Sequence, residues 1–176
     1  MCAVIVPGFG GVQRTACATN ALKTWYVCAV MSFTIRAAEM NDAAALAQLM
    51  CELGYETTKS DMQMRMERIA TDERYRTFVA VCDGKVCGMI GTVTSVSYEH
   101  NDPGGRILAL ATLSTMRRCG IGRALIATAE KDFAERGITR VALNTRLTRE
   151  DAHKFYESLG YERNGWRFVK QLSVRN

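Results

Sequence analysis

Apolar and polar residues follow a regular pattern only from Met31 onward. Residues 32–37 alternate one by one, which predicts a strand because successive side chains of a strand point to opposite faces. In the two segments that follow, the apolar residues recur at the spacing of a helix. Asn41 or Asp42 is expected to cap the first helix and Ser60 the second, since short polar side chains accept bonds from the first free amides.

A hairpin is predicted next, followed by alternating strands and helices. The apolar runs 77–82 and 86–96 flank Asp83-Gly84, and an Asp-Gly pair between two such runs is a strong hairpin signal. The remaining expected elements are a strand at 107–113, a helix from 122 to about 136, a strand at 141–143, a helix at 149–159 and a final strand at 167–172.

This order of elements predicts an α/β fold with a mixed sheet of about six to seven strands and helices on both of its faces. The helix between the strands at 107–113 and 141–143 is expected to form a right-handed crossover. A crossover of that kind makes the two strands parallel. The chain of 176 residues is long enough for one domain with a buried core.

The first thirty residues differ from the rest of the chain. They contain no Asp or Glu, and they lack the basic start and compact apolar block that a secretory signal has in order. We therefore interpret residues 1–30 as an extension or an over-called start that precedes the domain at 31–176, with an organelle-targeting segment as the alternative, because Arg14 and Lys23 are present and acidic residues are absent. No apolar run approaches ~20 residues, so no membrane span is expected. The protein is expected to be cytoplasmic.

The charge distribution and the cysteine pattern restrict the kinds of ligand that the protein is expected to bind. The formal net charge of +5 comes from scattered residues with a local concentration at Arg117, Arg118 and Arg123. That distribution favours an anionic small molecule over nucleic acid, which needs a broader basic face. The seven cysteines include no C-x-x-C pair, and His100 and His153 stand apart, so no metal site is expected.

A glycine-containing segment joins the strand at 107–113 to the following helix. The first amides of a helix have no partner within it and add to the positive end of the helix dipole. Glycines let the backbone approach phosphate oxygens closely, and arginines add charge at the rim. The segment that is predicted to hold a pyrophosphate in this way is Arg117-Arg118-Cys119-Gly120-Ile121-Gly122-Arg123.

Two common nucleotide motifs do not fit this segment. A Walker loop needs Lys-Ser or Lys-Thr after its second glycine, where this chain has Arg123-Ala124. A dinucleotide fingerprint needs a third glycine where this chain has Leu125. The residues alone leave one alternative open, a tight strand-to-helix turn with solvated arginines.

At this point the sequence resembles the GNAT superfamily of N-acetyltransferases. Its central motif, Arg/Gln-x-x-Gly-x-Gly/Ala at a strand-to-helix junction, is matched by Arg117, Gly120 and Gly122. Residues 152–161 (AHKFYESLGY) resemble the closing A-x-x-Phe-Tyr-x-x-x-Gly-Tyr/Phe stretch of the family. The resemblance extends from residue 32 to about 172. It implies transfer of an acetyl group from acetyl-CoA to a primary amine of a small molecule or peptide.

The resemblance also implies roles for single residues. The two parallel strands would splay apart, and the pantetheine arm of the cofactor would pair with the main chain of Leu110, Ala111 and Thr112. Tyr156 would protonate the departing thiolate. Many members have Asn where this chain has Arg149. That arginine either reaches the cofactor or is solvated.

Asn144 is expected to supply the missing amide. No side-chain general base is indicated, and the resemblance suggests a homodimer. A non-catalytic acetyl-CoA-binding sensor or interaction module remains the alternative function.

Overall fold

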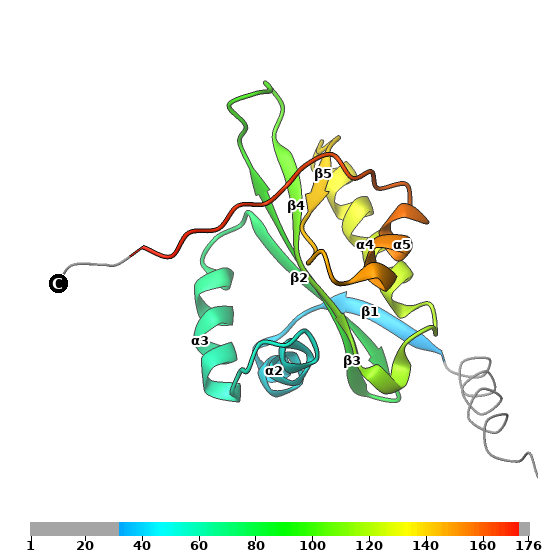
Figure 1. Ribbon diagram of the computed structural model, residues 1–176. Coiled ribbons are helices and arrows are strands. Elements are labelled where there is room, and N and C mark those ends of the chain that lie inside the picture. Colours follow the sequence, from blue (N-terminus) through cyan, green and yellow to red (C-terminus); the bar gives the residue numbers. More distant parts are fainter. Residues whose placement is uncertain (1–31, 173–176) are drawn as a thin grey trace, which may run out of the picture. The chain divides into compact units, whose positions relative to one another are not determined.

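The computed structural model describes residues 32–172 (Figure 1). The expected extension at 1–30 and the domain start at Met31 lie outside these residues, so both stay predictions. The described strands are β1 (Phe33–Ala37), β2 (Tyr75–Cys82), β3 (Lys85–Ser95), β4 (Gly104–Thr112) and β5 (Val141–Leu143). The helices are α2 (Ala43–Glu52), α3 (Lys59–Ala70), α4 (Ile121–Glu135) and α5 (Glu150–Glu157), with 3-10 turns at Met40–Asp42 and Ser114–Met116.

The strands form one mixed sheet in the order β1-β2-β3-β4-β5. The pairs from β1 to β4 are antiparallel, and β4 and β5 are parallel. The parallel pair joined through α4 is therefore confirmed. Between β2 and β3, Asp83 and Gly84 both have positive φ, at 48° and 72°, as a hairpin turn with right-handed strand twist requires.

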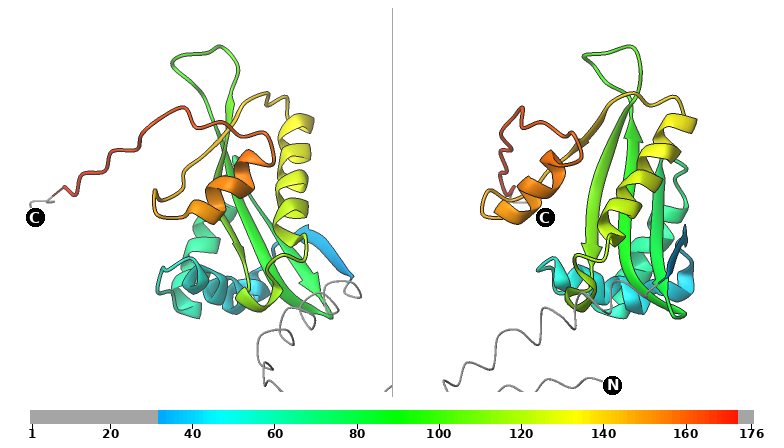
Figure 2. Two further views of the ribbon diagram at one scale, coloured as in Figure 1. Left: turned by 45° about the vertical axis from the view of Figure 1, so that its right-hand side comes forward. Right: turned by 90° about the vertical axis from the view of Figure 1, so that its right-hand side faces the viewer.

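Helices cover both faces of the sheet, and adjacent residues of β3 show how. The side chain of Met89 is buried with residues of α2 and α3 in one cluster. Its neighbour Gly88 points to the other face, where an added Cβ would lie 2.9 Å from Cγ2 of Ile121 in α4. Figure 2 shows α4 running along the sheet on the side away from α2 and α3. The predicted architecture is thus correct.

The two helix caps differ from the prediction. Thr58, not Ser60, caps α3: its hydroxyl accepts a bond from the Asp61 amide at 3.1 Å, and Asp61 in turn accepts from the Thr58 amide. Asp42 precedes α2, but its carboxylate makes no bond to that helix. It accepts instead from Arg36 and from the Glu39 amide.

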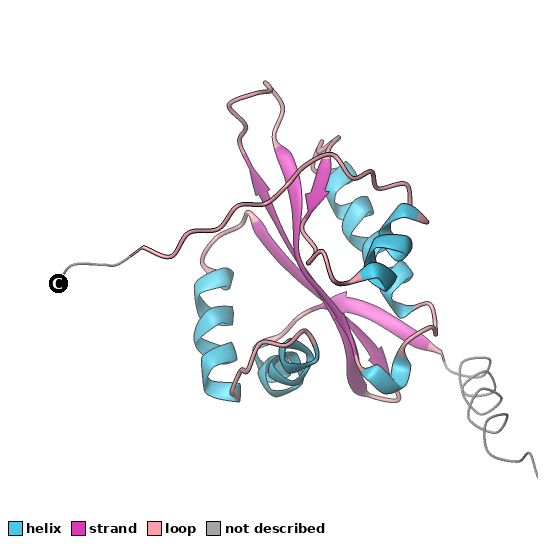
Figure 3. Cartoon of the chain, viewed as in Figure 1, coloured by secondary structure: helices cyan, strands magenta, loops and turns pink. Residues whose placement is uncertain are grey.

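The predicted strand at 167–172 is wrong. Residues 162–172 have no regular secondary structure, as the loop colour of Figure 3 shows, and all of them are exposed. Trp166 and Phe168 retain 77% and 92% of their accessible surface, so the alternating pattern buries nothing here. A strand needs a neighbouring edge as well as a pattern. The described sheet consequently has five strands, fewer than the six to seven expected.

No helix within residues 32–172 has the length and apolar character that crossing a bilayer requires. In the same residues, no three or more His, Cys, Asp or Glu side chains gather in a way that could hold a metal ion.

Candidate active site

The parallel strands β4 and β5 separate along their length. Their pairing runs from Gly105 opposite Val141 to Ile107 opposite Leu143 and ends there. Strand β4 continues to Thr112 against β3 alone. Leu108 has no partner in β3, because the register passes from Ile107 directly to Ala109, and this extra residue forms a bulge. Beyond the bulge, the edge of β4 on the side of β5 has no strand partner, and the region between the two separating strands (Figure 1) is termed the gap.

The main chain of β4 alternates between β3 and this gap. The Leu113 amide donates to the Cys87 carbonyl at 2.9 Å, so Leu113 faces β3. In an antiparallel ladder the neighbouring residue faces the other way. Leu110 and Thr112 therefore direct their main-chain groups into the gap. Ala111 directs its carbonyl toward β3, where it lies 3.2 Å from the Cβ position of Gly88.

This alternation limits the prediction that the main chain of residues 110–112 pairs with the cofactor. Only Leu110 and Thr112 offer main-chain groups to a guest in the gap, and Ala111 serves packing, with its side chain in the core cluster. Whether these groups bind a cofactor stays a prediction.

The start of α4 presents free amides. The first intrahelical bond at this end runs from the Ala124 amide to the Gly120 carbonyl at 3.0 Å. Within residues 32–172, the amides of Ile121, Gly122 and Arg123 donate to no protein acceptor. Gly120 has φ of 81°, a conformation that suits glycine, and within residues 32–172 no atom apart from those of its chain neighbours lies within 4 Å of its Cβ position. The Gly120 position is thus uncrowded by the described residues, and it lies at the positive end of the helix dipole.

Gly122 has a second role that sequence reasoning missed. A Cβ atom on Gly122 would lie 3.4 Å from Cζ of Phe155, so this position sets how closely α4 and α5 approach. Nearby, Arg123 donates to the Ser158 hydroxyl at 3.3 Å. The start of α4 and the helix that contains Tyr156 therefore pack against each other.

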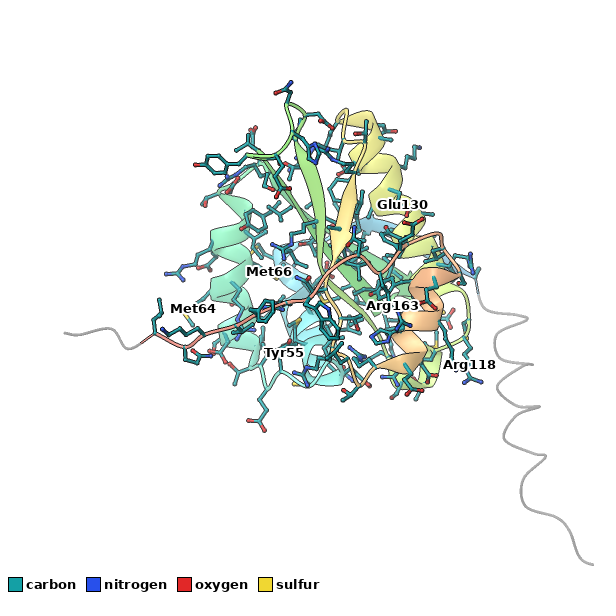
Figure 4. The ribbon with its side chains drawn as sticks, turned by 45° about the horizontal axis from the view of Figure 1, so that its top comes forward. Tyr55, Met64, Met66, Arg118, Glu130 and Arg163 are labelled. Atoms are coloured by element: carbon teal, nitrogen blue, oxygen red, sulfur yellow. The ribbon has the colours of Figure 1, made fainter. Side chains whose placement is uncertain are left out.

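The three arginines around the turn differ in their contacts. Arg117 pairs with Glu52 at the end of α2, at 3.2 Å. The same carboxylate accepts bonds from the amide and hydroxyl of Ser114, which, with the charge of Arg117, lower the pKa of Glu52. Arg118 is exposed and has a positive φ of 64°. Figure 4 shows it at the edge of the molecule beside α5. Among the described residues Arg118 makes no ion pair, so it is available for an anion at the turn, whereas Arg123 shares its guanidinium with the Ser158 hydroxyl.

Tyr156 lies in α5 between two aromatic rings. Its ring centroid is 5.3 Å from that of Phe155 and 5.9 Å from that of Tyr161. Burial raises the pKa of Tyr156, and the charge of Arg149 offsets part of this effect. Within the described residues the Tyr156 hydroxyl has no hydrogen-bond partner, whereas Tyr161 donates to Glu130 at 2.8 Å. Tyr156 is thus a protonated phenol available to a bound molecule.

The remaining predicted residues lie around this region. Asn144 and Arg149 are exposed, the first just after β5 and the second immediately before α5. Cys119 is half-buried within the turn. The backbone of the loop between β5 and α5 is held by His153, whose Nε2 lies 3.0 Å from the Arg146 carbonyl oxygen. No local sequence signal marks the Glu52 contacts, which join residues far apart in the chain.

Known proteins match this arrangement. Residues 43–161 fit the model of the acetyltransferase (GNAT) family. An aminoalkylphosphonate N-acetyltransferase of Salmonella typhimurium is 32% identical over 143 residues, which are 78% of this chain and 90% of that protein.

Two solved structures are similar in fold. A GNAT family acetyltransferase of Staphylococcus aureus has a TM-score of 0.69 and 28% identity over 81% of this chain and all of its own. An aminoglycoside N-acetyltransferase in complex with CoA has a TM-score of 0.72 at 17% identity, with 82% and 97% of the two chains covered.

Proposed function

The chain belongs to the GNAT family and is an N-acetyltransferase, and from this premise we propose that it transfers acetyl from acetyl-CoA directly to the primary amine of a small molecule. The observation that carries the proposal is the set of three free amides at Ile121, Gly122 and Arg123 beside an uncrowded glycine. Helix N-termini of this kind suit a diphosphate. With Arg118 and Arg123 close by, the residues present fit the pyrophosphate of CoA.

Each part of the site has one task in this scheme. The free amides and arginines at the turn would hold the diphosphate. The main chain of Leu110 and Thr112 would pair with the amide groups of the pantetheine arm, and a free amide in the gap would stabilise the negative charge that develops on the thioester oxygen. Asn144 and Arg149 would contact the cofactor from the far side of the gap.

Acetyl-CoA supplies a thioester whose C–S bond breaks as the amine nitrogen forms the new C–N bond. Tyr156 would give its phenolic proton to the departing thiolate, a group of similar basicity. The pKa of Tyr156, raised by burial, keeps this proton in place at neutral pH. The amine would lose its proton to water, since no carboxylate is positioned by sequence as a base. A Tyr156 hydroxyl without a hydrogen-bond partner among residues 32–172 favours this role over a non-catalytic binding module.

Small-molecule acceptors are favoured over peptides because two proteins similar to this chain are named for acetylation of aminoalkylphosphonates and aminoglycosides. The cytoplasmic location and the homodimer remain predictions.

The test is release of free CoA thiol from acetyl-CoA with a panel of amines, in the wild-type protein and in Tyr156→Phe. We expect turnover on at least one amine and its loss in the variant. Absence of turnover on every amine, together with absence of CoA binding by calorimetry, would contradict the proposal.

A further inference from the structure

A cation–aromatic contact joins two loops beside the gap. The guanidinium carbon of Arg146 lies 5.5 Å from the ring centroid of Tyr55. Tyr55 belongs to the loop between α2 and α3, and Arg146 to the loop between β5 and α5. In the view of Figure 4, Tyr55 lies between α3 and α5. Planar guanidinium groups stack well on aromatic faces, which favours this orientation of the arginine.

The position of this pair relates it to the reaction. The end of α2 is fixed to the end of β4 by the bonds of Glu52 with Ser114, and Tyr55 follows shortly after Glu52. Arg146 follows shortly after β5 ends at Leu143. The pair therefore joins the loop that follows α2 to the loop that follows β5, beside the separated strands. It approaches from the face covered by α2, whereas α4 and its free amides lie against the other face.

The charges beside the Tyr55–Arg146 contact are those of Arg146, Arg65, Glu56 and Asp61, whose carboxylate accepts bonds from Thr58. Within the part of the chain that the structure describes, Arg146 forms no ion pair with a carboxylate. Arg65 approaches the same loop and donates to the Thr57 hydroxyl at 3.1 Å, and that hydroxyl donates to the Tyr55 carbonyl. Glu56 is exposed in this loop and is its acidic residue. A guanidinium held in place without a protein anion suits the two oxygens of an acid.

We propose that the acceptor amine carries an acidic group, a phosphonate or a carboxylate, and that Arg146, held on the Tyr55 ring, binds it. The inference rests on the proposed function, because it names the acceptor class of that site. Arg146 then determines specificity: it anchors the acid so that the amine at the other end of the molecule reaches the gap.

The test compares three amines of similar length: 2-aminoethylphosphonate, β-alanine and propylamine, whose tail is neutral. They are assayed with wild-type protein, Arg146→Gln and Arg146→Lys. A charge-assisted bond contributes enough that its loss raises KM by about 10- to 100-fold. We expect Arg146→Gln to show this rise for both acids, and Arg146→Lys to recover part of it. Values for propylamine and the Kd of CoA should not change.

Arg68→Gln is the matched control, because it removes an exposed arginine one turn after Arg65 without touching either loop. It should leave all three amines unaffected. A KM rise in Arg146→Gln that is equal for acids and propylamine would overturn the inference, as would a wild-type preference for propylamine.

Failure of the proposed function is recognised separately. If no amine is turned over, calorimetric binding of 2-aminoethylphosphonate to wild type and Arg146→Gln still tests the anchor. Equal binding, or no binding to either, contradicts it.

Discussion

The carboxylate of Glu52 accepts two hydrogen bonds from Ser114, one from the amide at 3.2 Å and one from the hydroxyl at 2.9 Å. Glu52 ends α2, and Ser114 opens the turn that leads from β4 to α4. The Glu52 side chain thus links the end of α2 to the turn between β4 and α4, and this turn leads to the free amides of Ile121, Gly122 and Arg123. Because Arg117 binds the same carboxylate, its position depends on Glu52 as well.

Replacement of Glu52 by alanine should weaken CoA binding through loss of this support. The Ser114 amide and Arg117 lose their acceptor, so the turn between β4 and α4 becomes more mobile. CoA binding must then order this turn, which costs conformational entropy. We expect Kd for CoA, measured by calorimetry, to rise by about 10-fold, the effect of about one lost hydrogen bond. The control is Glu135→Ala, which removes only an exposed pair with Lys131. An unchanged Kd in Glu52→Ala would show that the turn between β4 and α4 keeps its conformation without the Glu52 carboxylate.

Gly122 should tolerate a methyl group but no larger side chain. A Cβ atom there only reaches van der Waals contact with Phe155, so Gly122→Ala should bind CoA nearly as well as wild type. Gly122→Glu adds bulk against Phe155 and negative charge beside the free amides, and it should abolish CoA binding. Ala127→Glu adds the same charge on an exposed position of α4 and serves as control. Retained affinity in Gly122→Glu would contradict the anion site.

Tyr156→Phe should lower kcat by about 100-fold or more, the usual contribution of a positioned acid. CoA affinity should not change, because the hydroxyl makes no hydrogen bond to any described residue that the substitution would remove. Tyr98→Phe, at an exposed tyrosine, is the control. A kcat within twofold of wild type would exclude Tyr156 as the proton donor.

The pH profile gives an independent check on Tyr156. Burial raises its pKa above the ordinary value of 10.0, so the proton is lost only at higher pH. In wild type, the loss of kcat that stems from this group should therefore begin above about pH 10. A basic limb near pH 8 that disappears in Tyr156→Phe would show that the pKa is lowered, contrary to the structure.

Asp42 should matter for stability and not for catalysis. Its buried carboxylate accepts two bonds from Arg36, at 2.7 and 2.8 Å, and one from the Glu39 amide. Asp42→Ala should lower the free energy of unfolding by about 2 kcal/mol, because Arg36 and the amide lose their acceptor. Denaturant unfolding measures this, with the exposed Glu135→Ala as control. A change below about 0.5 kcal/mol would contradict the assignment.

The bonds from Arg36 also lower the pKa of Asp42 in the folded protein below 3.8. A carboxylate with a lowered pKa contributes stability that is present above its unfolded pKa and lost as the pH falls through the folded value. Wild type should therefore lose more stability than Asp42→Ala below about pH 4. Parallel pH curves for the two proteins would count against the ion pair.

Local signals in the sequence predicted most of the fold. Asp83-Gly84 specifies a hairpin by its backbone preferences, and α4 ends close to the predicted residue 136, just before Gly137, which has φ of 74°. The cap of α3 was also readable, since Thr58-x-x-Asp61 is a capping box. The absence of the final strand could not be predicted, because the pattern at 167–172 does not show whether a sheet edge is available for pairing.

The candidate site, too, was predictable where it depends on one local segment and not where it depends on contacts between distant residues. The free amides follow from a glycine turn that runs into a helix, which is a local property of residues 117–123. The contacts of Glu52 with Ser114, and of Tyr55 with Arg146, join residues far apart in the chain. Such pairs depend on how the elements pack, and no single segment encodes them.

Backbone amide resonances of Ile121, Gly122 and Arg123 offer the most direct test of the anion site. In a ¹⁵N-labelled sample, CoA should shift all three strongly, because each gains a phosphate acceptor. Pantetheine, which lacks the diphosphate, should shift residues of β4 such as Leu110 and Thr112 but leave these three nearly unchanged. If CoA binds while the three amides keep their free positions, the diphosphate lies elsewhere and the account is wrong.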